Sequence, residues 1–556
     1  MDGSLAMRAL SQLVERGIGP ILAVALGLAG PPARAQEAPP EPAEDVAAPQ
    51  EVTPSPAKAS PQDAAAPQEL PAVNAALKSL LEARAPAPNV PGLPHSKERE
   101  AIAAFYAARG FAPIWWTDGQ PSIEVASILA RLEHASEDGL GIKYAPPSLS
   151  PTDDASIAGA DVTLTDAVVA YGRQATGSRV DPRVISRLIG EEPHVADPAD
   201  ILARVASAGI LAGDELQKFN PPQKAYAALR QKLMQLRRGR GLAAAGPPIP
   251  PGPVLRLGMR DPRVPLLRAR LNVEDTERDE DSIYDASTAA AVAEFQRANG
   301  LPPTGHLTAR TVAALSRTQA SAPLEAEIIA NMERWRWMPR DLGESHIDVN
   351  IPDYEAVIID KGEVIERTRV VVGKEETPTP IFSNTMKFLI VNPYWNVPPS
   401  IIRKEMLPKL AADPHYLSRL GYEVFSRNGQ LVVRQPPGER NALGRIKFMF
   451  PNDFSVYLHD TPMRKLFAES KRAFSHGCVR VDDPFRFAQI VLGQGWSEER
   501  VKKLIGGKER YVFLPKPLPV HLEYFTAYVD DTGALQLRDD VYGYSRKVRE
   551  ALGFNG

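Results

Sequence analysis

The stretch AFSHGCVRVDD, residues 473–483, contains the only cysteine in the chain, Cys478. His476 and Gly477 stand directly before it. A lone cysteine cannot form an internal disulfide, so its thiol is either a buried structural side chain or a chemically used one. The thiolate is the nucleophilic form of cysteine, and a protonated histidine or a helix terminus nearby favours it. The stretch therefore raises the question of which histidine could serve Cys478.

Two histidines are candidates for a partner of Cys478. His476 precedes it by two positions, and residues i and i+2 face the same way in an extended segment. His459 ends the predicted strand SVYLHD, and a strand, a loop and a return would bring it beside Cys478. Gly477 permits a tight turn, so the backbone amides of Gly477 and Cys478 could point at an oxyanion. Nucleophile, base and oxyanion donors are the parts that acyl transfer needs.

The N-terminus has the composition of an export signal. Arg8 and Arg16 precede the apolar run ILAVALGLAG, residues 21–30, and residues 33–35 (ARA) form a small-x-small cleavage site. The run has about 10 residues, fewer than the ~20 that span a membrane. We expect a signal peptide over residues 1–35 and a periplasmic protein, with an uncleaved membrane anchor as the alternative.

Length and composition bound the remaining chain. A chain of 556 residues predicts several domains, since single cores rarely exceed ~250–300 residues. The net charge of −3 shows no basic excess, which argues against nucleic acid as a partner. No later stretch is apolar enough for a transmembrane helix. Residues 36–70 are rich in proline and alanine and predict a disordered linker.

Two helical regions follow the linker. Apolar residues recur every three or four positions over 71–245, which predicts a helical scaffold domain. GPPIPPGP, residues 246–253, then marks a boundary. Three short helices are predicted within 254–318, with starts at Asp261, at Asp285 or Ser287, and at Thr308.

The hydrophobic period changes to two near Ser345. HIDVNI, YEAVIID and EVIERTRVVVG, among others, read as strands and predict a mostly-β domain over residues 345–515. An excursion at about 401–439 includes the helical IIRKEMLPKLA and interrupts the strands, so we expect an inserted lid. Residues 516–556 are expected to form a C-terminal extension that packs on this domain. The predicted fold class is multidomain α+β.

The full motif is more specific than any histidine–cysteine pair. HDTP (459–462) followed by SHGCVR (475–480) resembles the signature of the YkuD-type L,D-transpeptidases. The stretches that extend this resemblance are TPTPIF (377–382), VNPYWNVPPS (391–400), QPPGERNALG (435–444) and YLHDTP (457–462).

The three-helix segment resembles the peptidoglycan-binding domain type 1. The positions that carry this resemblance are Val264, Leu267, Leu271, Tyr284, Asp285, Thr288, Val292, Phe295, Gln296, Gly300, Leu301, Thr304, Gly305, Thr311 and Leu315. With the helical region before it, the whole chain resembles the long periplasmic YcbB-like branch of murein L,D-transpeptidases.

The resemblance implies a mechanism on specific residues. Cys478 would attack the third residue of a stem tetrapeptide, releasing D-alanine and forming a thioester, and His459 would be the general base. A diamino acid amine of a second stem would resolve the thioester into a 3→3 cross-link. Ser475, His476 and Gly477 would shape the loop and its field. Position 480 is Arg480, where the family usually has Asn. The resemblance implies no cofactor and no metal.

Other side chains could contact the substrate. Arg480 and Arg445 could bind stem carboxylates, although a surface arginine is more often merely solvated. The aromatic residues that could line the groove, or else belong to the core, are Tyr457, Trp395, Tyr394 and Trp335. His415, in the lid, is expected at the surface. The expected partners are peptidoglycan stem peptides and glycan, with cell-wall synthesis proteins as further possible ones.

Several alternatives remain open or fall away. Water as acceptor would give an L,D-carboxypeptidase or endopeptidase, and a protein amine would give a wall-anchoring enzyme. A non-catalytic wall-binding scaffold is the alternative of a different class. A D,D-transpeptidase is excluded, because the S-x-x-K at residues 55–58 lies in the linker without its partner motifs. The local signature of a papain-like protease and paired zinc ligands are absent from the sequence.

Overall fold

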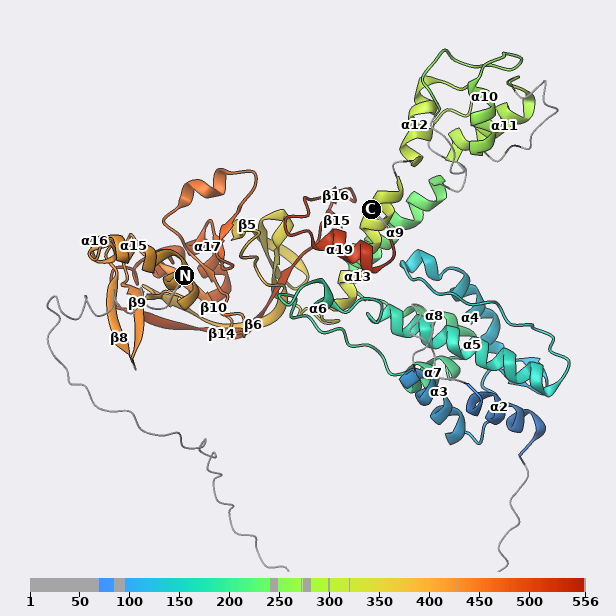
Figure 1. Cartoon of the computed structure of the whole chain (residues 1–556), viewed down its shortest axis with the longest axis horizontal. Coiled ribbons are helices and arrows are strands. Elements are labelled where there is room, and N and C mark those ends of the chain that lie inside the picture. Colours follow the sequence, from blue (N-terminus) through green and yellow to red (C-terminus); the bar gives the residue numbers. More distant parts are fainter. Residues whose placement is uncertain are drawn as a thin grey trace, which may run out of the picture. The chain divides into compact units, whose positions relative to one another are not determined.

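The computed structural model describes residues 70–84, 96–240, 249–271, 273, 282–298, 301–319, 321–427 and 429–554 (Figure 1). The predicted signal peptide, and the predicted linker up to residue 69, lie outside these residues. Val397–Val424 belongs to one compact unit, and Pro71–Asn396 with Phe425–Gly556 to another. Among the described residues, no helix combines the length and the apolar composition needed to cross a membrane.

The N-terminal region is helical, as predicted, and capping residues mark where its helices begin. Asp153 forms a capping box with Ser156, and Asp181 and Asp197 each cap a helix whose first residue is proline. The helices are α2 (Ala72–Glu82), α3 (Ser96–Ala108), α4 (Ile123–Glu133), η1 (Ala135–Asp138), α5 (Asp154–Ala175), α6 (Pro182–Ile185), α7 (Pro198–Ala206), η2 (Gly209–Leu211), α8 (Ala212–Gln217) and α9 (Lys224–Arg240). A short hairpin, β1 (Trp116–Thr117) and β2 (Gln120–Pro121), lies between α3 and α4.

Three helices form the predicted small bundle: α10 (Arg263–Leu271), α11 (Ala286–Ala298) and α12 (Ala309–Gln319). Gln296 is buried, donates to Thr311 Oγ1 at 2.9 Å and accepts from the Gly305 backbone at 2.9 Å. The Tyr284 hydroxyl donates to the Gly305 carbonyl at 2.8 Å. These side chains, which carried the sequence resemblance, therefore serve the core and the turns of the bundle.

The mostly-β domain is built on one sheet of nine strands. Its order is β12-β5-β13-β11-β10-β6-β14-β3-β4, with β4 also paired to β5. The strands are β3 (His346–Asn350), β4 (Glu355–Asp360), β5 (Glu363–Gly373), β6 (Phe382–Val391), β10 (Ile446–Met449), β11 (Leu458–His459), β12 (Ala473–Ser475), β13 (Val479–Val481) and β14 (Arg510–Glu523). The helices of this domain are η3 (Ile351–Asp353), η5 (Arg464–Ala468), α17 (Pro484–Leu492) and α18 (Glu498–Lys502).

The predicted domain boundary at residue 515 cuts through strand β14. This strand lies between β6 and β3, and its last part, Val520–Glu523, pairs in parallel with β3. Prolines lack the N–H that a central strand donates. Pro515 and Pro517 therefore argued against a central strand at this point of the sequence. The structure accommodates them by shifting the register against β6 between Phe513 and Leu518. Beyond β14 come β15 (Ala527–Val529), β16 (Leu535–Leu537) and α19 (Tyr544–Ala551).

The inserted segment is helical where IIRKEMLPKLA predicted a helix. Its helices are α14 (Pro399–Ile401), the π-helical η4 (Ile402–Met406), α15 (Leu407–Ala412) and α16 (Tyr416–Arg419). A small sheet of order β7-β9-β8 contains β7 (Trp395–Asn396), β8 (Glu423–Arg427) and β9 (Gln430–Gln435).

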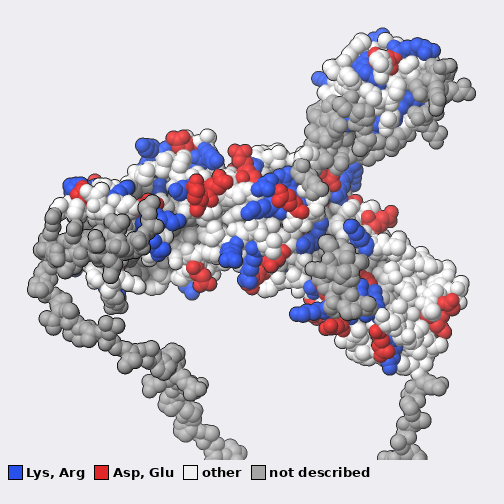
Figure 2. Space-filling model, in the orientation of Figure 1, with Lys and Arg blue, Asp and Glu red and all other residues white. Residues whose placement is uncertain are grey.

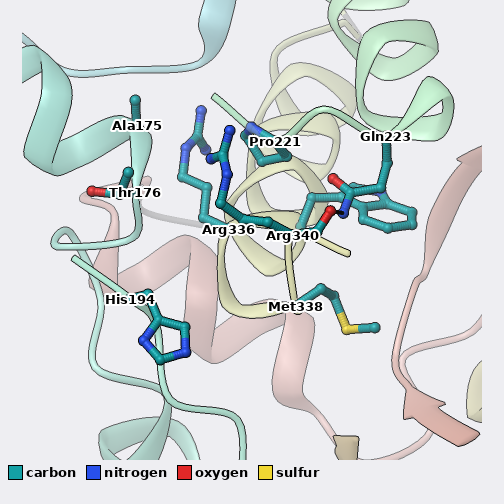
Figure 3. A pocket seen from close by; sticks show the side chains of 9 residues that line it. Ala175, Thr176, His194, Pro221, Gln223, Arg336, Met338 and Arg340 are labelled. Carbon is teal, nitrogen blue, oxygen red and sulfur yellow. Dashed lines mark hydrogen bonds between the residues drawn. The ribbon is translucent and has the colours of Figure 1, made fainter. Parts of the chain in front are cut away.

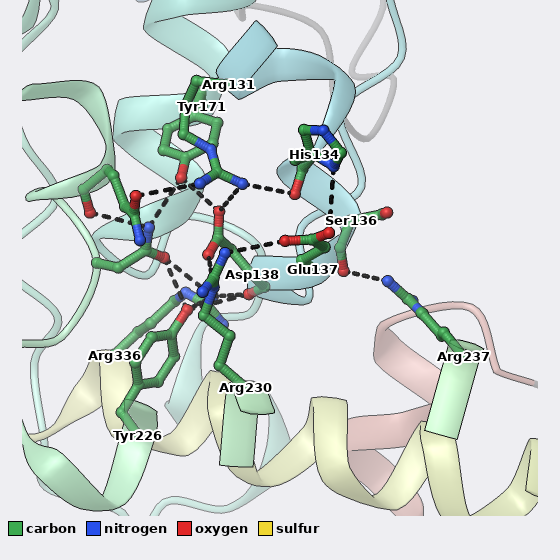
Figure 4. A network of polar contacts seen from close by, with 12 residues as sticks. Arg131, His134, Ser136, Glu137, Asp138, Tyr171, Tyr226, Arg230, Arg237 and Arg336 are labelled. Carbon is green, nitrogen blue, oxygen red and sulfur yellow. Dashed lines mark hydrogen bonds and ion pairs between the residues drawn. The ribbon is translucent and has the colours of Figure 1, made fainter. Parts of the chain in front are cut away.

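Helix α13 (Ser321–Trp337) is an element that the sequence-based domain division left between two domains. Its C-terminal Arg336 donates to the carbonyl of Asp138 at 2.5 Å, and the fully buried Asp138 carboxylate accepts from Tyr171 and Arg230, both at 2.6 Å (Figure 4). Because a buried carboxylate is costly unless it is paired and hydrogen-bonded, this network stabilises the contact of α13 with the helical region. Acidic and basic side chains are intermixed over the visible surface (Figure 2), as the small net charge suggests.

A second polar contact joins the helical region to the nine-stranded sheet. Ser383 Oγ on β6 lies 2.7 Å from Glu191 Oε1 and 2.7 Å from His521 Nδ1 on β14. Burial lowers the pKa of His521, which is therefore neutral. Its Nε2 lies 3.0 Å from the carbonyl of Leu342, so Nε2 carries the single proton and Nδ1 accepts from Ser383. The single Ser383 proton is then used, and Glu191 must be the donor to Ser383. Burial of Glu191, which is 7% exposed, raises the pKa of its carboxyl to about 7, in agreement.

The protonated Glu191 predicts a pH-dependent stability. Its pKa in the folded state, about 7, exceeds the ordinary ~4.3 of an unfolded chain. The folded state then binds more protons than the unfolded state between these values, so the free energy of unfolding falls as pH rises through this window. Glu191→Gln keeps the donor to Ser383, and we expect it to stabilise the protein by about 1–3 kcal/mol at pH above about 7. Chemical denaturation at several pH values measures this, with the exposed Glu192→Gln as control. Equal stability of the Glu191→Gln protein and the wild type at every pH would contradict the protonation assigned here.

Candidate active site

The sheet register brings the predicted catalytic residues together. Strand β11 pairs in parallel with β13, which sets His459 level with Arg480. On its other edge β11 pairs antiparallel with β10, which sets His459 level with Lys447. Paired residues share a face of a sheet, so the three side chains lie on one face. The alternate residues, among them Leu458 and Val479, are fully buried in the core on the other face.

Cys478 lies at the start of β13, beside Tyr457. The Val479 backbone donates to the Tyr457 carbonyl at 3.1 Å, and the Tyr457 hydroxyl hydrogen-bonds to the Cys478 thiol. The Tyr457 ring lies 5.7 Å from the His459 ring, centroid to centroid. The structure therefore groups nucleophile, predicted base and one predicted substrate contact on adjacent strands. The crossover between β11 and β13 is parallel, not the simple return that the sequence suggested.

His459 is oriented by the residue that follows it. Its ring is 4% exposed, and Nδ1 contacts the backbone carbonyl of Asp460. A carbonyl can only accept, so Nδ1 carries the proton and Nε2 keeps its lone pair. Burial, together with the positive charges of Arg480 and Lys447, lowers the pKa of His459 to about 3. Hydrogen bonds to the backbone of Asp460 and Leu443 oppose this lowering of the pKa. His459 is therefore a neutral imidazole at neutral pH, the form that a general base requires.

The Asp460 side chain holds this orienting carbonyl in place. Its carboxylate accepts from the Arg445 backbone at 2.7 Å and from the Arg464 guanidinium at 2.6 Å. Gly444 lies so close that a Cβ there would stand 2.3 Å from the Asp460 carboxylate. Sequence reasoning missed Asp460 and Arg464 as supporting residues, although the acidic residue directly after His459 was a visible signal.

Ser475 shapes the loop that carries the nucleophile. Its hydroxyl donates to the Cys478 carbonyl at 2.5 Å and accepts from the Gly477 backbone at 3.0 Å. Gly477 has a φ of +114°, a left-handed conformation that side chains disfavour. Because its N–H already bonds to Ser475, Gly477 is not placed as the oxyanion donor that the sequence suggested. Of the two backbone amides suggested as oxyanion donors, only that of Cys478 remains a candidate. Gly477 provides the backbone conformation of the turn.

A second layer of contacts reaches this loop from the far end of the chain. Thr379 Oγ1 donates to the Gly477 carbonyl and accepts from the Gly373 backbone, both at 2.8 Å. The Tyr542 hydroxyl donates to the Gly373 carbonyl at 2.6 Å and accepts from the Thr379 backbone at 3.2 Å. The loop conformation therefore depends on residues that precede and follow the motif by long stretches of sequence.

Positive charge surrounds a thiol that is itself neutral. Lys447 Nζ lies 3.7 Å from the centroid of the Tyr457 ring, and Arg480 has a buried Nε without a partner among the described residues. Burial raises the pKa of Cys478, while hydrogen bonds from Tyr457 and the charges of Lys447 and Arg480 oppose that rise. With neutral His459 beside it, the pair is not a preformed thiolate–imidazolium pair. For Cys478 to act as the predicted nucleophile, its proton would have to pass to a base such as the neutral His459.

The remaining predicted residues occupy different places. His476 is exposed beside the nucleophile, and Tyr394 and Trp395 are half-buried, with Trp395 on β7 opposite Gln435. Trp335 belongs to another core, where its ring stacks on Phe525 at 4.5 Å between centroids. It lines a small pocket in the helical region, together with residues that include His194 and Arg336 (Figure 3). His415 is exposed, as expected.

Arg445 lines a pocket together with Asp460, the residue whose backbone carbonyl contacts His459. The pocket has a volume of about 840 Å³ including its open mouth. Its other charged lining residues are Glu439, Asp460, Arg464 and Lys502. Arg445 contacts Glu439 at 3.1 Å, so this cation faces an exposed carboxylate that a ligand could replace. Among the described residues, no group of three or more His, Cys, Asp or Glu could hold a metal ion.

Comparison with protein families divides the chain in three. The model of an L,D-transpeptidase catalytic domain, YkuD, matches residues 344–507. A "Scaffold domain" matches residues 100–233, and a "Putative peptidoglycan binding domain" matches residues 260–315. The resemblances to a YkuD-type catalytic domain and to a peptidoglycan-binding domain are thereby confirmed, as is the multidomain α+β fold class.

Individual relatives agree in name. A protein of Haemophilus influenzae named "Putative L,D-transpeptidase" is 33% identical over 268 residues, covering 44% of this chain and 54% of that one. The chain thus spans about half the length of this relative. An L,D-transpeptidase structure from Mycobacterium smegmatis is 14% identical, with a TM-score of 0.19, over 32% of this chain and 58% of that one. One from Xylanimonas cellulosilytica is 17% identical, with a TM-score of 0.16, over 49% of this chain and 100% of that one.

The neutral thiol–imidazole pair predicts how Cys478 reacts in the free protein. Because the thiol pKa is raised and that of His459 is about 3, alkylation by iodoacetamide should keep rising beyond pH ~8.5. No inflection is expected near pH ~6.5, where an ordinary histidine titrates. Mass spectrometry of the sole cysteine gives the rate at each pH. Lys447→Met removes a nearby positive charge and should slow alkylation at a fixed pH. A rate plateau reached near pH 6 would instead indicate a preformed thiolate.

Proposed function

We propose, from the premise that residues 344–507 are an L,D-transpeptidase catalytic domain of the YkuD family, that this chain forms 3→3 cross-links in peptidoglycan. The single observation that carries the proposal is the grouping of Cys478, Tyr457 and neutral His459 on adjacent strands. The site has a thiol, a base with a free lone pair and a hydrogen-bond donor to sulfur, which are the requirements of acyl transfer through a thioester.

The first half-reaction forms the thioester. His459 Nε2 takes the thiol proton as Cys478 Sγ attacks the carbonyl of the third residue of a stem tetrapeptide. The Cys478 amide donates to the oxyanion that develops, and Tyr457 donates to sulfur. The intermediate collapses with cleavage of the C–N bond, and D-alanine leaves with the proton that His459 returns. A positioned base contributes about 10²–10⁴-fold to such a rate.

The second half-reaction transfers the acyl group. The side-chain amine of a diamino acid on another stem gives its proton to His459 and attacks the thioester carbonyl. A C–N bond forms, the C–S bond breaks, and Cys478 regains the proton. One amide bond is exchanged for another, so the reaction needs no cofactor. The bundle α10–α12 would hold the chain on the glycan meanwhile, and the predicted signal peptide would bring it to the periplasm.

Arg480 is the favoured contact for a stem carboxylate. Its side chain is level with His459, near the thiol, and its Nε is buried without a described partner. A buried, unpaired donor is costly until a partner supplies an acceptor. Arg445 is the second candidate, but it contacts Glu439 and lies in the pocket that Asp460 also lines. We assign that pocket to the acceptor stem, because Asp460, which orients His459, is one of its lining residues.

Three alternative functions are considered. Two of them use the same catalytic residues, and the third involves no catalysis. Water as acceptor would make the enzyme a carboxypeptidase or endopeptidase, and a protein amine would make it a wall-anchoring enzyme. A wall-binding scaffold without catalysis is favoured by the bundle alone, and the oriented His459 beside Cys478 argues against it.

The test of the proposed function is product analysis. We expect the full chain without residues 1–35 to convert a disaccharide-tetrapeptide into a dimer that has lost one D-alanine, detected by mass spectrometry. Cys478→Ala should abolish this product. A tripeptide monomer without dimer would identify water as the acceptor. No product, together with no acylation of Cys478 by a carbapenem, would favour the scaffold function.

The two arginines can be separated by matched substitutions. Loss of a charged hydrogen bond costs about 1.5–3 kcal/mol, so Arg480→Gln should raise the KM for the donor tetrapeptide about 10- to 100-fold, with a smaller change in kcat. Arg445→Gln, the matched control, should leave the donor KM within about threefold. Steady-state release of D-alanine measures both. The reverse ranking would assign the donor carboxylate to Arg445.

A further inference from the structure

The face of the sheet that carries the nucleophile continues as a row of apolar side chains. Strands β13, β11, β10, β6 and β14 lie side by side in that order. Residue by residue, the row level with Cys478 passes through Tyr457 and Met449 to Phe388 and Phe513. Because directly paired residues share a face, all five side chains lie on the catalytic side of the sheet.

A second row of side chains on the same face crosses the same strands, two residues away along each strand. It starts with Arg480 and His459, continues with Lys447 and Ile390, and ends with Tyr511 on β14. The polar catalytic groups therefore stand at one end of both rows. Aromatic groups stand at the other end.

The aromatic end of this face is exposed. Tyr511 is 54% and Phe513 is 69% accessible to solvent, although large aromatic side chains are usually covered. The half-buried Phe388 lies between them, with its ring centroid 5.5 Å from that of Tyr511 and 5.3 Å from that of Phe513. A contiguous exposed aromatic surface on the same sheet face as a candidate catalytic group is typical of a ligand-binding site.

We propose that Tyr511, Phe513 and Phe388 bind the N-acetylhexosamine ring to which the donor stem peptide is attached. The inference rests on the proposed function and adds a glycan subsite to it. A pyranose ring presents an apolar face of C–H groups to an aromatic face, and its hydroxyl and amide groups suit the polar tip of Tyr511. A basic or acidic ligand is not favoured, because the three side chains carry no charge.

The separation between nucleophile and aromatic surface fits the length of a stem. Neighbouring strands lie about 4.8 Å apart, so β6 and β14 are roughly 14–19 Å from β13. Three stem residues extend at most about 3.5 Å each, and the link to the sugar adds about one residue more, giving roughly 14 Å. With the third carbonyl of the stem at Cys478, the sugar would reach Phe388 on β6, whose ring adjoins those of Tyr511 and Phe513 on β14.

The direction of the stem follows from burial on the other side. On strand β5, Val371 pairs with Arg480 and is fully buried. The catalytic face is thus covered toward β5, whereas it stays open at Tyr511 and Phe513 on β14. Ile390 on β6 is only 6% exposed, so a donor that reaches Cys478 would extend its stem along the half-buried Met449 and Phe388 toward β14.

The test compares two substrates that differ only in the sugar. The full chain releases D-alanine from a disaccharide-tetrapeptide or from the same tetrapeptide without the disaccharide. In Tyr511→Ala/Phe513→Ala we expect the ratio of the two kcat/KM values to fall about tenfold toward one, as two aromatic contacts of ordinary strength would give. Ile365→Ala, at an apolar side chain on β5 that is 46% exposed, is the control and should leave the ratio unchanged.

An unchanged ratio in the double variant would overturn the proposal. An equal fall in kcat/KM for both substrates, as a structural effect would cause, also leaves the ratio unchanged and counts against it. The bundle is identical in all variants, so its own affinity for glycan cancels in the comparison. Calorimetric titration of Cys478→Ala, with and without the Tyr511→Ala/Phe513→Ala substitutions, gives the corresponding change in the ratio of Kd values without turnover. If the wild type processed neither substrate, the proposed reaction would fail, yet the Kd ratio would still decide the glycan subsite.

Discussion

The parallel pairing of β11 with β13 is the constraint on which the candidate site depends. One residue of slip would turn His459 into the core and Leu458 outward, because side chains alternate along a strand. The same register aligns Lys447 from β10 and, through β6, the aromatic residues of β14. Catalytic groups and the proposed substrate surface are therefore consequences of a single alignment of strands.

Burial gives this site a particular electrostatic character. Burial disfavours the charged forms of both Cys478 and His459. Without substrate, the site therefore contains a neutral thiol and a neutral imidazole. Lys447 and Arg480 supply positive potential without supplying a proton acceptor. A substrate that excludes the remaining water strengthens these interactions at the moment when sulfur becomes negative.

Local patterns in the sequence predicted elements well and their pairing poorly. Period-two runs and caps identified the strands and helices, because each signal is contained in a few neighbouring residues. The HDTP and SHGC motifs predict His459 and Cys478 as the site residues in the same local way. The parallel crossover, the central position of β14 and the role of α13 depend on contacts between distant segments. The prolines of β14 wrongly indicated that this segment is not a central strand. The sequence also could not predict that the Gly477 N–H donates to Ser475, because residue identity does not determine which way a backbone amide points.

The contacts of Tyr542 have a consequence for the order in which the protein is assembled. Its hydroxyl bonds both Gly373 and Thr379, which in turn hold Gly477 beside the nucleophile. An exported chain emerges on the far side of the membrane from its N-terminus onward, so the helical region and the bundle can fold before this tyrosine has emerged. The turn at Cys478 receives its last support only then. The reactive part of the molecule is thus among the latest to mature, and a chain shortened before Tyr542 would keep its thiol but lose the turn that aims it.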